Sequence, residues 1–353
     1  MTRFPARDAV RAMSGYHSPQ VDVPVRLNTN ESPFPPPAEW VESLARIASE
    51  TEWNRYPDRS ARPLREAIAV RHGVAPENVF VANGSNEVLQ TILLTYGGHG
   101  RTVATYEPTY QMYAQIARVT GAEVVTGERR GDFTLDTEEV RRICDRHSPA
   151  VTMLCNPNNP TGIAEPRETL DVLRAATDGV VVVDEAYAEF GEWSAVDDVA
   201  EDANLVVTRT FSKTLSMAAL RVGYAVAPRW MVAELETAVL PYHLDAFKQA
   251  ATVAALGHVA EMEDRVARVR AERARIEAAF AEMGVEHWPS GANFVLFRVP
   301  AAATVWRSML DDGVLVRDCS GWQRLAECLR VTVGTPDENS AFLQALRRAL
   351  ARP

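Results

Sequence analysis

A lysine is the first residue of this sequence whose chemistry stands out. The chain has 353 residues and 37 basic side chains, and only Lys213 and Lys248 among these are lysines. A guanidinium carries charge and binds anions, but only an amine can lose its proton and form a Schiff base with a carbonyl. Lys213 follows Ser212 just beyond the apolar run 205–208, and Arg221 comes eight residues later. We therefore interpret Lys213 as a reactive amine rather than a surface lysine.

A glycine-containing stretch offers a second chemical feature. Residues 82–87 read Ala-Asn-Gly-Ser-Asn-Glu, after an apolar run and before a helix that we expect from about Asn86 to Tyr96. Gly84 and Ser85 would present free backbone N–H groups at the positive end of that helix, which suits a phosphate. A simple helix cap at Ser85 is the alternative. The stretch matches neither a P-loop nor a dinucleotide-binding glycine motif.

Further polar residues follow two other apolar runs. The turn 156–162, Asn-Pro-Asn-Asn-Pro-Thr-Gly, ends one run and would present an amide to a ligand ring. Asp184 closes the next run, where a carboxylate is costly unless it is paired. It is either a helix N-cap or the counter-ion of a protonated ring nitrogen, with Tyr187 nearby. With a phosphate held by Thr210, Ser212 and Arg221, these parts are those that pyridoxal 5'-phosphate requires.

Strands and helices alternate through the first two thirds of the chain. Several of the expected strands are continuous valine-rich runs, which is typical of strands covered on both faces. The intervening helices favour an α/β fold with a mainly parallel, doubly wound sheet, whose ligands bind beyond the carboxyl ends of the strands. The seven expected strands are residues 79–81, 102–105, 123–126, 151–155, 180–184, 205–208 and 224–227.

The two ends of the chain differ from this pattern. Residues 1 to about 40 are rich in proline, and their aromatic and apolar side chains predict an ordered arm. After Pro241 we expect long helices over 246–283, interrupted at Gly257, and then a small α+β domain. That domain would have strands at 293–298, 314–317 and 329–333 and helices at 303–312 and 338–351. The predicted division is an arm and small-domain segment (1–40), a large domain (41–245) and a small domain (246–353).

Composition limits the function classes. The net charge is -10 with no basic block, so binding to nucleic acid or to an anionic membrane is not expected. No apolar run approaches the ~20 residues of a membrane span. The four cysteines form no C-x-x-C pair, which predicts reduced thiols in a cytoplasmic protein and neither a disulfide framework nor a metal site.

The motifs together resemble a known family. From about residue 16 to 342, the sequence resembles the fold-type-I pyridoxal-phosphate aminotransferases and is similar, within them, to the histidinol-phosphate aminotransferases of actinobacteria. It departs from their pattern at Ala218-Ala219, where Ala-Gly is usual, at the prolines 35–37, and at Asn86, where an acidic residue is common. The phrases that carry the resemblance are 26–31, 55–58, 82–89, 108–113, 156–162, 184–190, 208–224, 240–244, 289–294 and 329–335.

The resemblance implies a role for individual residues. Lys213, Asp184 and Tyr187 would be catalytic, with Asp184 on the ring nitrogen and Tyr187 with Asn159 on the ring hydroxyl, while Tyr110 stacks on the ring. Tyr56 would reach the cofactor of a neighbouring subunit, which implies a homodimer with shared sites. The cofactor phosphate would be held by Gly84, Ser85, Thr210, Ser212 and Arg221, with Asn86 beside them; the substrate would be bound by Tyr16, Asn30, Arg317 and Arg330.

The expected reaction follows from the same resemblance. It is amino transfer between L-histidinol phosphate and 2-oxoglutarate, in histidine biosynthesis, with Arg330 binding the glutamate carboxylate and, with Arg317, the substrate phosphate. A solvent-facing strand arginine is the alternative for Arg330. The alternative functions are an aromatic amino-acid aminotransferase, a decarboxylase of the phosphothreonine type, and a regulator that has lost catalysis. For the last of these, residues 1–40 are too short and proline-rich for a DNA-binding segment.

Overall fold

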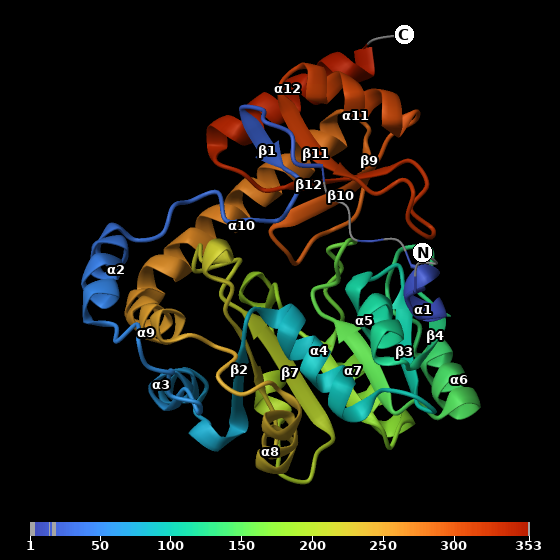
Figure 1. Ribbon diagram of the computed structural model, residues 1–353. Helices are drawn as coiled ribbons and strands as arrows, with labels where there is room; N and C mark the ends of the chain where they lie inside the picture. Colours follow the sequence, from blue (N-terminus) through green and yellow to red (C-terminus); the bar gives the residue numbers. More distant parts are fainter. Residues whose placement is uncertain (1–3, 14, 16–18, 352–353) are drawn as a thin grey trace.

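The chain builds two β-sheets, each with its own helices (Figure 1). The computed structural model describes residues 4–13, 15 and 19–351. The larger sheet has seven strands and lies in the part of the molecule that holds most of residues 60–240. Its strands, in spatial order, are β2 (Val79–Ala82), β8 (Gly223–Val226), β7 (Leu205–Thr210), β6 (Val180–Asp184), β5 (Val151–Cys155), β3 (Thr102–Glu107) and β4 (Glu123–Glu128).

The larger sheet confirms the predicted fold class. Strands β7, β6, β5, β3 and β4 pair in parallel, and β8 is antiparallel to both of its neighbours, β2 and β7. Every residue of β5, β6 and β7 is buried, as their continuous apolar runs predicted. The direction of β8 was not foreseen. It brings the start of that strand, rather than its end, to the edge of the sheet where the parallel strands finish.

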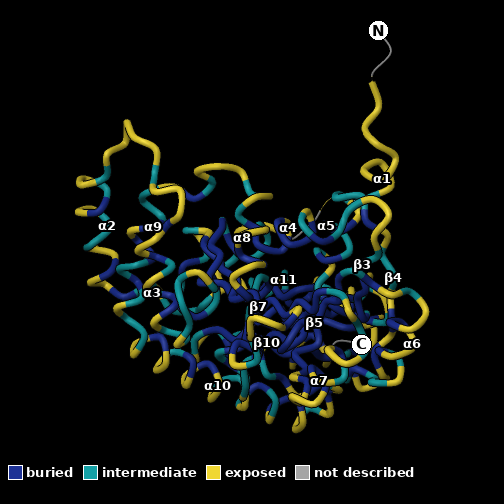
Figure 2. The backbone as a smooth tube through the Cα atoms, turned by 90° about the horizontal axis from the view of Figure 1, so that it is seen from below, coloured by how far each residue is buried: buried dark blue, intermediate teal, exposed yellow. Residues whose placement is uncertain are grey.

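Helices cover both faces of this sheet. Alternate residues of β6 point to opposite faces, so that Val181 and Val183 join one hydrophobic cluster and Val180 and Val182 join another. Helices α4 (Ser85–Tyr96), α5 (Met112–Thr120) and α8 (Arg229–Ala238) pack on the second cluster. The first is covered by α3 (Arg62–His72), α6 (Thr137–His147) and α7 (Arg167–Ala176). Figure 2 shows the strands buried in the interior, with the exposed surface on the outer turns of the helices.

The smaller sheet combines both ends of the chain. Its order is β1 (Val25–Leu27), β11 (Val314–Asp318), β12 (Cys328–Thr332), β10 (Phe294–Arg298) and β9 (Glu286–His287). Strand β1 pairs in parallel with β11, and this is where the predicted N-terminal arm is anchored. Helices α11 (Ala302–Asp311) and α12 (Pro336–Ala351) pack against each other and against this sheet. A short N-terminal helix that the sequence did not predict, α1 (Asp8–Arg11), packs on α5 of the larger sheet.

Two consecutive helices connect the sheets. Helix α9 (Ala246–Ala255) packs against α2 (Ala38–Glu50) and α3, and α10 (Val259–Glu282) continues to the smaller sheet after a break at Gly257. Within these two helices, the buried apolar residues as far as Met262 belong to the core of the larger sheet, and those from Val266 onward belong to the core of the smaller one. We retain the domain division at residues 40 and 245 as a proposal. No helix in the described part of the chain combines the length and apolar character that crossing a bilayer requires.

Candidate active site

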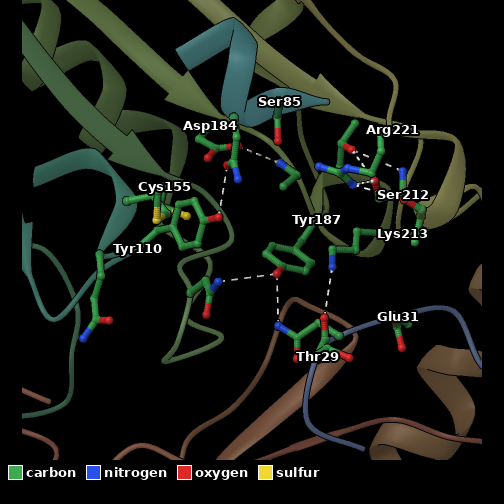
Figure 3. Close-up of a pocket in the computed structure, with 18 of the residues that line it drawn as sticks. Thr29, Glu31, Ser85, Tyr110, Cys155, Asp184, Tyr187, Ser212, Lys213 and Arg221 are labelled. Carbon is green, nitrogen blue, oxygen red and sulfur yellow. Dashed lines mark hydrogen bonds between the residues drawn. The ribbon is translucent and has the colours of Figure 1, made fainter. Parts of the chain in front are cut away.

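A cavity of about 620 Å³ lies at the carboxyl ends of the parallel strands, facing the smaller sheet (Figure 3). Residues from the ends of β5, β6 and β7 line one side, and the N-terminal segment and the smaller sheet line the other. The predicted residues that the structure brings together here are Asn30, Ser85, Asn86, Tyr110, Asn159, Asp184, Tyr187, Thr210, Ser212, Lys213, Arg221 and Arg330.

Lys213 extends its amine across this cavity. It comes three residues after the end of β7, and its Nζ donates a hydrogen bond to the carbonyl oxygen of Thr29 at 3.2 Å. The same nitrogen lies 5.8 Å from the centroid of the Tyr187 ring. Burial, and after it the charge of Arg330, lower the pKa of the Lys213 amine to about 8, and Glu31 opposes the shift. About a tenth of this amine is therefore neutral, and so nucleophilic, at pH 7.

Asp184 is a buried carboxylate at the end of β6. Tyr113 Oη donates to its Oδ2 at 2.7 Å, while the backbone N–H of Ala186 and the hydroxyl of Thr208 donate to Oδ1, each at 3.2 Å. Burial raises the pKa of the Asp184 carboxyl, and these hydrogen bonds oppose the rise. The contact with Ala186 replaces the helix N-cap considered above, because no α-helix starts here. A cation placed beside this group would relieve the cost of burying its charge.

Hydroxyls, a guanidinium and a helix N-terminus converge at the other end of the cavity. Thr210 donates to Ser212 Oγ at 3.0 Å, and Arg221 Nη1 donates to the same oxygen at 3.3 Å. Ser85 is the first residue of α4 and does not cap it; Gly84 holds the N-cap position with φ of 80°. A Cβ on Gly84 would lie 2.7 Å from Arg221 Nη2, so only glycine leaves this space open. The set of donors is suited to a phosphate.

Side chains with ring or amide groups line the middle of the cavity. Tyr187 Oη accepts hydrogen bonds from Asn30 Nδ2 at 3.0 Å and from Asn159 Nδ2 at 3.5 Å. Tyr110 donates to Asn86 Oδ1 at 3.1 Å and meets the Tyr113 ring edge-on, with the centroids 5.4 Å apart. This arrangement leaves aromatic faces and amide groups around the space between Asp184 and Lys213, where a flat ring would fit.

Arg330 supplies a buried positive charge from the smaller sheet. Only 5% of the residue is exposed, which excludes the alternative of a solvent-facing strand arginine. Its Nη1 donates to Asn159 Oδ1, its Nη2 donates to the Asn28 carbonyl at 3.1 Å, and its guanidinium lies 5.0 Å from the Phe294 ring centroid. Its Nε is buried and has no hydrogen-bond partner. Arg330 also lines the cavity, so its guanidinium places a positive charge where an anionic ligand would be stabilised.

The remaining predicted residues lie elsewhere. Arg317 is the register partner of Arg330 on β11, but it lines a neighbouring hollow rather than this cavity. Tyr56 is 80% exposed and stacks on Tyr242, with ring centroids 4.6 Å apart, away from the cavity lining. Tyr16 lies outside the described residues. The roles assigned to these three side chains stay predictions.

Several residues that line the cavity or contact its lining had no role in the sequence prediction. Tyr113 and Thr208 were inside two of the quoted motifs, and their hydroxyls could have been paired with the buried Asp184. Thr29 and Glu31 flank the predicted Asn30 and line the same wall. Trp322, from the loop between β11 and β12, had no sequence signal at all, because its position depends on how the two sheets face each other.

Comparisons with known proteins identify the family of the chain. The family described as aminotransferase class I and II matches residues 22–346. The chain therefore belongs to the class I and II aminotransferases, and its enzymatic class is that of a transaminase.

Within this family, the chain is similar to histidinol-phosphate aminotransferases from several bacteria. The chain is 46% identical to the histidinol-phosphate aminotransferase of Frankia casuarinae, over 98% of this chain and 90% of that protein. It is 44% identical to the enzyme of the same name from Thermobifida fusca, over 99% and 96% of the two chains. The crystal structure of histidinol-phosphate aminotransferase from Sinorhizobium meliloti, in complex with pyridoxal-5'-phosphate, has the same fold. It has a TM-score of 0.89 at 23% identity and covers 99% of this chain and 98% of that one.

Proposed function

We propose that this chain transfers an amino group between L-histidinol phosphate and 2-oxoglutarate, giving imidazole acetol phosphate and glutamate, as a step in histidine biosynthesis. The names of its near full-length relatives support this reaction. The observation that carries the proposal is the pairing of two groups in one cavity: the amine of Lys213 and the buried guanidinium of Arg330, whose Nε has no hydrogen-bond partner. The first suits a carbonyl and the second suits an anionic substrate.

Pyridoxal 5'-phosphate is the cofactor that we propose for this cavity. The converging donors of Thr210, Ser212 and Arg221, and the space that Gly84 leaves open, fit its phosphate. Asp184 is a buried carboxylate suited to a protonated ring nitrogen. Lys213 is the amine suited to its aldehyde, and the volume is in the range of small-molecule sites.

The residues divide the chemical work between them. Bound pyridoxal phosphate supplies an electron sink for the charge that forms when a substrate amine loses its Cα proton. Asp184 would balance positive charge on the ring, and Tyr113 and Thr208 hold its carboxylate in one orientation. Lys213, with a pKa of about 8, would accept the Cα proton at Nζ and return it to another carbon.

Arg330 would bind the anionic group of each substrate in turn. Glutamate has an α-carboxylate, which a planar guanidinium grips through two hydrogen bonds. Histidinol phosphate has no carboxylate, so its phosphate would take that position, with Arg317 on the adjacent strand adding charge. Asn30 would close over the substrate on the side of the smaller sheet. Its backbone N–H donates to Thr332 Oγ1 at 3.0 Å and its Oδ1 accepts from the same hydroxyl at 3.1 Å, so this part of the wall is held in place.

We also propose a homodimer whose active sites are shared. Tyr56 and Leu240 are 80% and 76% exposed, and exposed apolar groups of this kind are typical of interaction surfaces. Arg221, at the phosphate end of the cavity, is exposed in the single chain, where a second subunit would cover it. Mixing Tyr56→Ala with Lys213→Ala protein tests this. Hybrid dimers should regain activity, because one of their two sites combines an intact Lys213 from one subunit with an intact Tyr56 from the other. A mixture that stays inactive would contradict shared sites.

The partners we propose are otherwise small molecules. The four cysteines are buried and free, which supports a reducing cytoplasmic setting. The acidic net charge of -10 gives no support to nucleic-acid or anionic-membrane binding.

A substrate panel with 2-oxoglutarate as acceptor tests the proposed reaction. Histidinol phosphate should exceed phenylalanine in kcat/KM by at least roughly tenfold, because its phosphate carries more negative charge to Arg330 than a carboxylate does. A preference for phenylalanine would instead identify an aromatic amino-acid aminotransferase. Release of carbon dioxide without consumption of 2-oxoglutarate would identify a decarboxylase.

Spectroscopy tests the role of Lys213 separately from the choice of substrate. The purified enzyme loaded with pyridoxal phosphate should show the visible absorbance of a lysine-bound cofactor, and Lys213→Ala should lack both that band and turnover. Lys248→Ala is the matched control, since it removes the only other lysine of the chain. If Lys213→Ala keeps the band and the activity, the assignment of the amine is wrong.

A further inference from the structure

A second hollow of about 690 Å³ adjoins the active-site cavity. Residues of α1, of α5, and of β11 and the loop after it line this hollow, among them Arg118 and Arg317. Only Gln111 and Trp322 line both spaces, within the described part of the chain. Gln111 comes from the larger sheet's side and Trp322 from the smaller sheet's side, so these two side chains form the wall between the spaces.

An arginine lies on each side of this wall, Arg330 on the inner side and Arg317 on the outer side. The guanidinium of Arg317 lies 5.4 Å from the centroid of the Trp322 ring. Arg317 lines the outer hollow but not the inner cavity. An arginine in this position is attracted to the face of the indole. Trp322 also lines the inner cavity, as does Arg330, so the side chain borders the space into which Arg330 reaches.

We propose that Trp322 determines specificity for the amino donor, by providing the surface against which the planar ring of that donor lies. This inference rests on the proposed function, since it needs a donor with both a ring and an anionic group. Arg330 would hold the anionic group, and the indole beside it would pack on the imidazole. Offset or edge-on packing of aromatic rings adds to the gain from burying their surface.

The loop that carries Trp322 is already fixed in place. The backbone N–H of Trp322 donates to the Cys319 carbonyl at 2.9 Å, and the backbone N–H of Leu325 donates to the Trp322 carbonyl at 3.1 Å. Leu325 is fully buried. The guanidinium of Arg324 donates to backbone carbonyls of the larger sheet's side, at residues 129 and 130. The indole therefore needs little ordering when a ligand binds, which favours affinity.

Trp322 should act in only one of the two half-reactions. Glutamate has no ring, so it would bind Arg330 and make no ring contact with the indole. Histidinol phosphate would use both residues. Loss of the indole should therefore change the relative rates of the two donors, whereas loss of Arg330 should slow both.

Single-turnover kinetics of the cofactor-loaded enzyme with each donor tests this role. Trp322→Ala should lower kcat/KM for histidinol phosphate at least tenfold and leave glutamate within about twofold. Trp322→Phe keeps an aromatic face and should lose less than about threefold. Trp322→Leu keeps apolar packing without a ring; it should reproduce the selective loss if the alanine variant does not fold.

The matched control is Trp288→Phe. Trp288 belongs to the hydrophobic cluster that Trp322 packs on and has Arg298 over its ring at 5.0 Å, but it does not line the cavity. It should change neither donor by more than about twofold. Equal losses for both donors in the Trp322 variants, or no loss for histidinol phosphate, would overturn the role of Trp322. A wild-type enzyme that does not turn over histidinol phosphate would instead refute the proposed function.

Discussion

Replacing Lys213 by methionine should make the cofactor-free protein more stable. The pKa of this amine falls from 10.5 to about 8 on folding. Each unit corresponds to about 1.4 kcal/mol, so the charged amine costs the folded state on the order of 3 kcal/mol near pH 7. Methionine has a similar length, fills the space and carries no charge. Its gain in unfolding free energy should therefore reach about 1–3 kcal/mol, less than the full cost because water can enter the cavity.

The assay is urea unfolding of both proteins, freed of cofactor, at equal concentration and at several pH values. The folded pKa lies below the unfolded one, so the unfolded state binds more protons between pH 8 and 10.5. The unfolding free energy of the wild type therefore rises through that window, and the advantage of Lys213→Met should shrink toward zero above it.

A matched variant controls for the loss of any lysine. Lys248 donates to Asn83 Oδ1 at 2.8 Å and pairs with Asp245 at 3.3 Å, so Lys248→Met removes favourable contacts and should not stabilise the protein. A Lys213→Met protein no more stable than wild type at pH 7, or an advantage that persists at pH 10.5, would refute the reasoning.

Three other predictions concern single residues. Arg330→Lys should lower kcat/KM for both donors, by an amount equal to a rise of about 1.5–3 kcal/mol in activation free energy, because lysine lacks the planar guanidinium fork. Cofactor affinity should not change. Single-turnover rates measure the first effect and cofactor titration the second. Gly84→Ala should weaken cofactor binding at least roughly tenfold in equilibrium dialysis, because its Cβ would meet Arg221, whereas Gly257→Ala, with open space around it, should not. Burial lowers the pKa of His72 to about 3, so its neutral form stabilises the fold above pH 6.5 and this is lost as pH falls. His72→Phe should therefore remove about 2–3 kcal/mol of the stability loss that wild type shows between pH 7 and 4.5, and an unchanged slope in urea unfolding would count against it.

Much of the larger sheet was predictable because burial leaves a direct mark on composition. Strands covered on both faces must be apolar throughout, and the valine runs ending at Cys155 and Asp184 have the bounds that the structure shows. Strand β1 has only three residues, and the direction of β8 depends on its partners. Local sequence predicts neither the three-residue strand nor the direction of β8, so both became known only from the structure.

The candidate site divides in the same way. Lys213 and Asp184 follow strands whose carboxyl ends meet at one sheet edge, which is why a rule of topology could place them together. Tyr113 reaches Asp184 from a helix, and Trp322 reaches the cavity from the other sheet. Their positions depend on packing between distant segments. Tyr56 cannot contribute to the cavity of its own chain, so its role needs a second copy to be tested.

The connection between β7 and β8 also sets a limit on how this protein can be altered. Thr210 and Gly223 are register partners, and the Phe211 N–H donates to the Val222 carbonyl at 3.2 Å, so residues 211–222 form a loop closed at its base. Lys213 and Arg221 lie near the two ends of this loop, and added or missing residues between them would change their spacing. Random mutagenesis should therefore yield active substitutions in this loop but no active insertions or deletions.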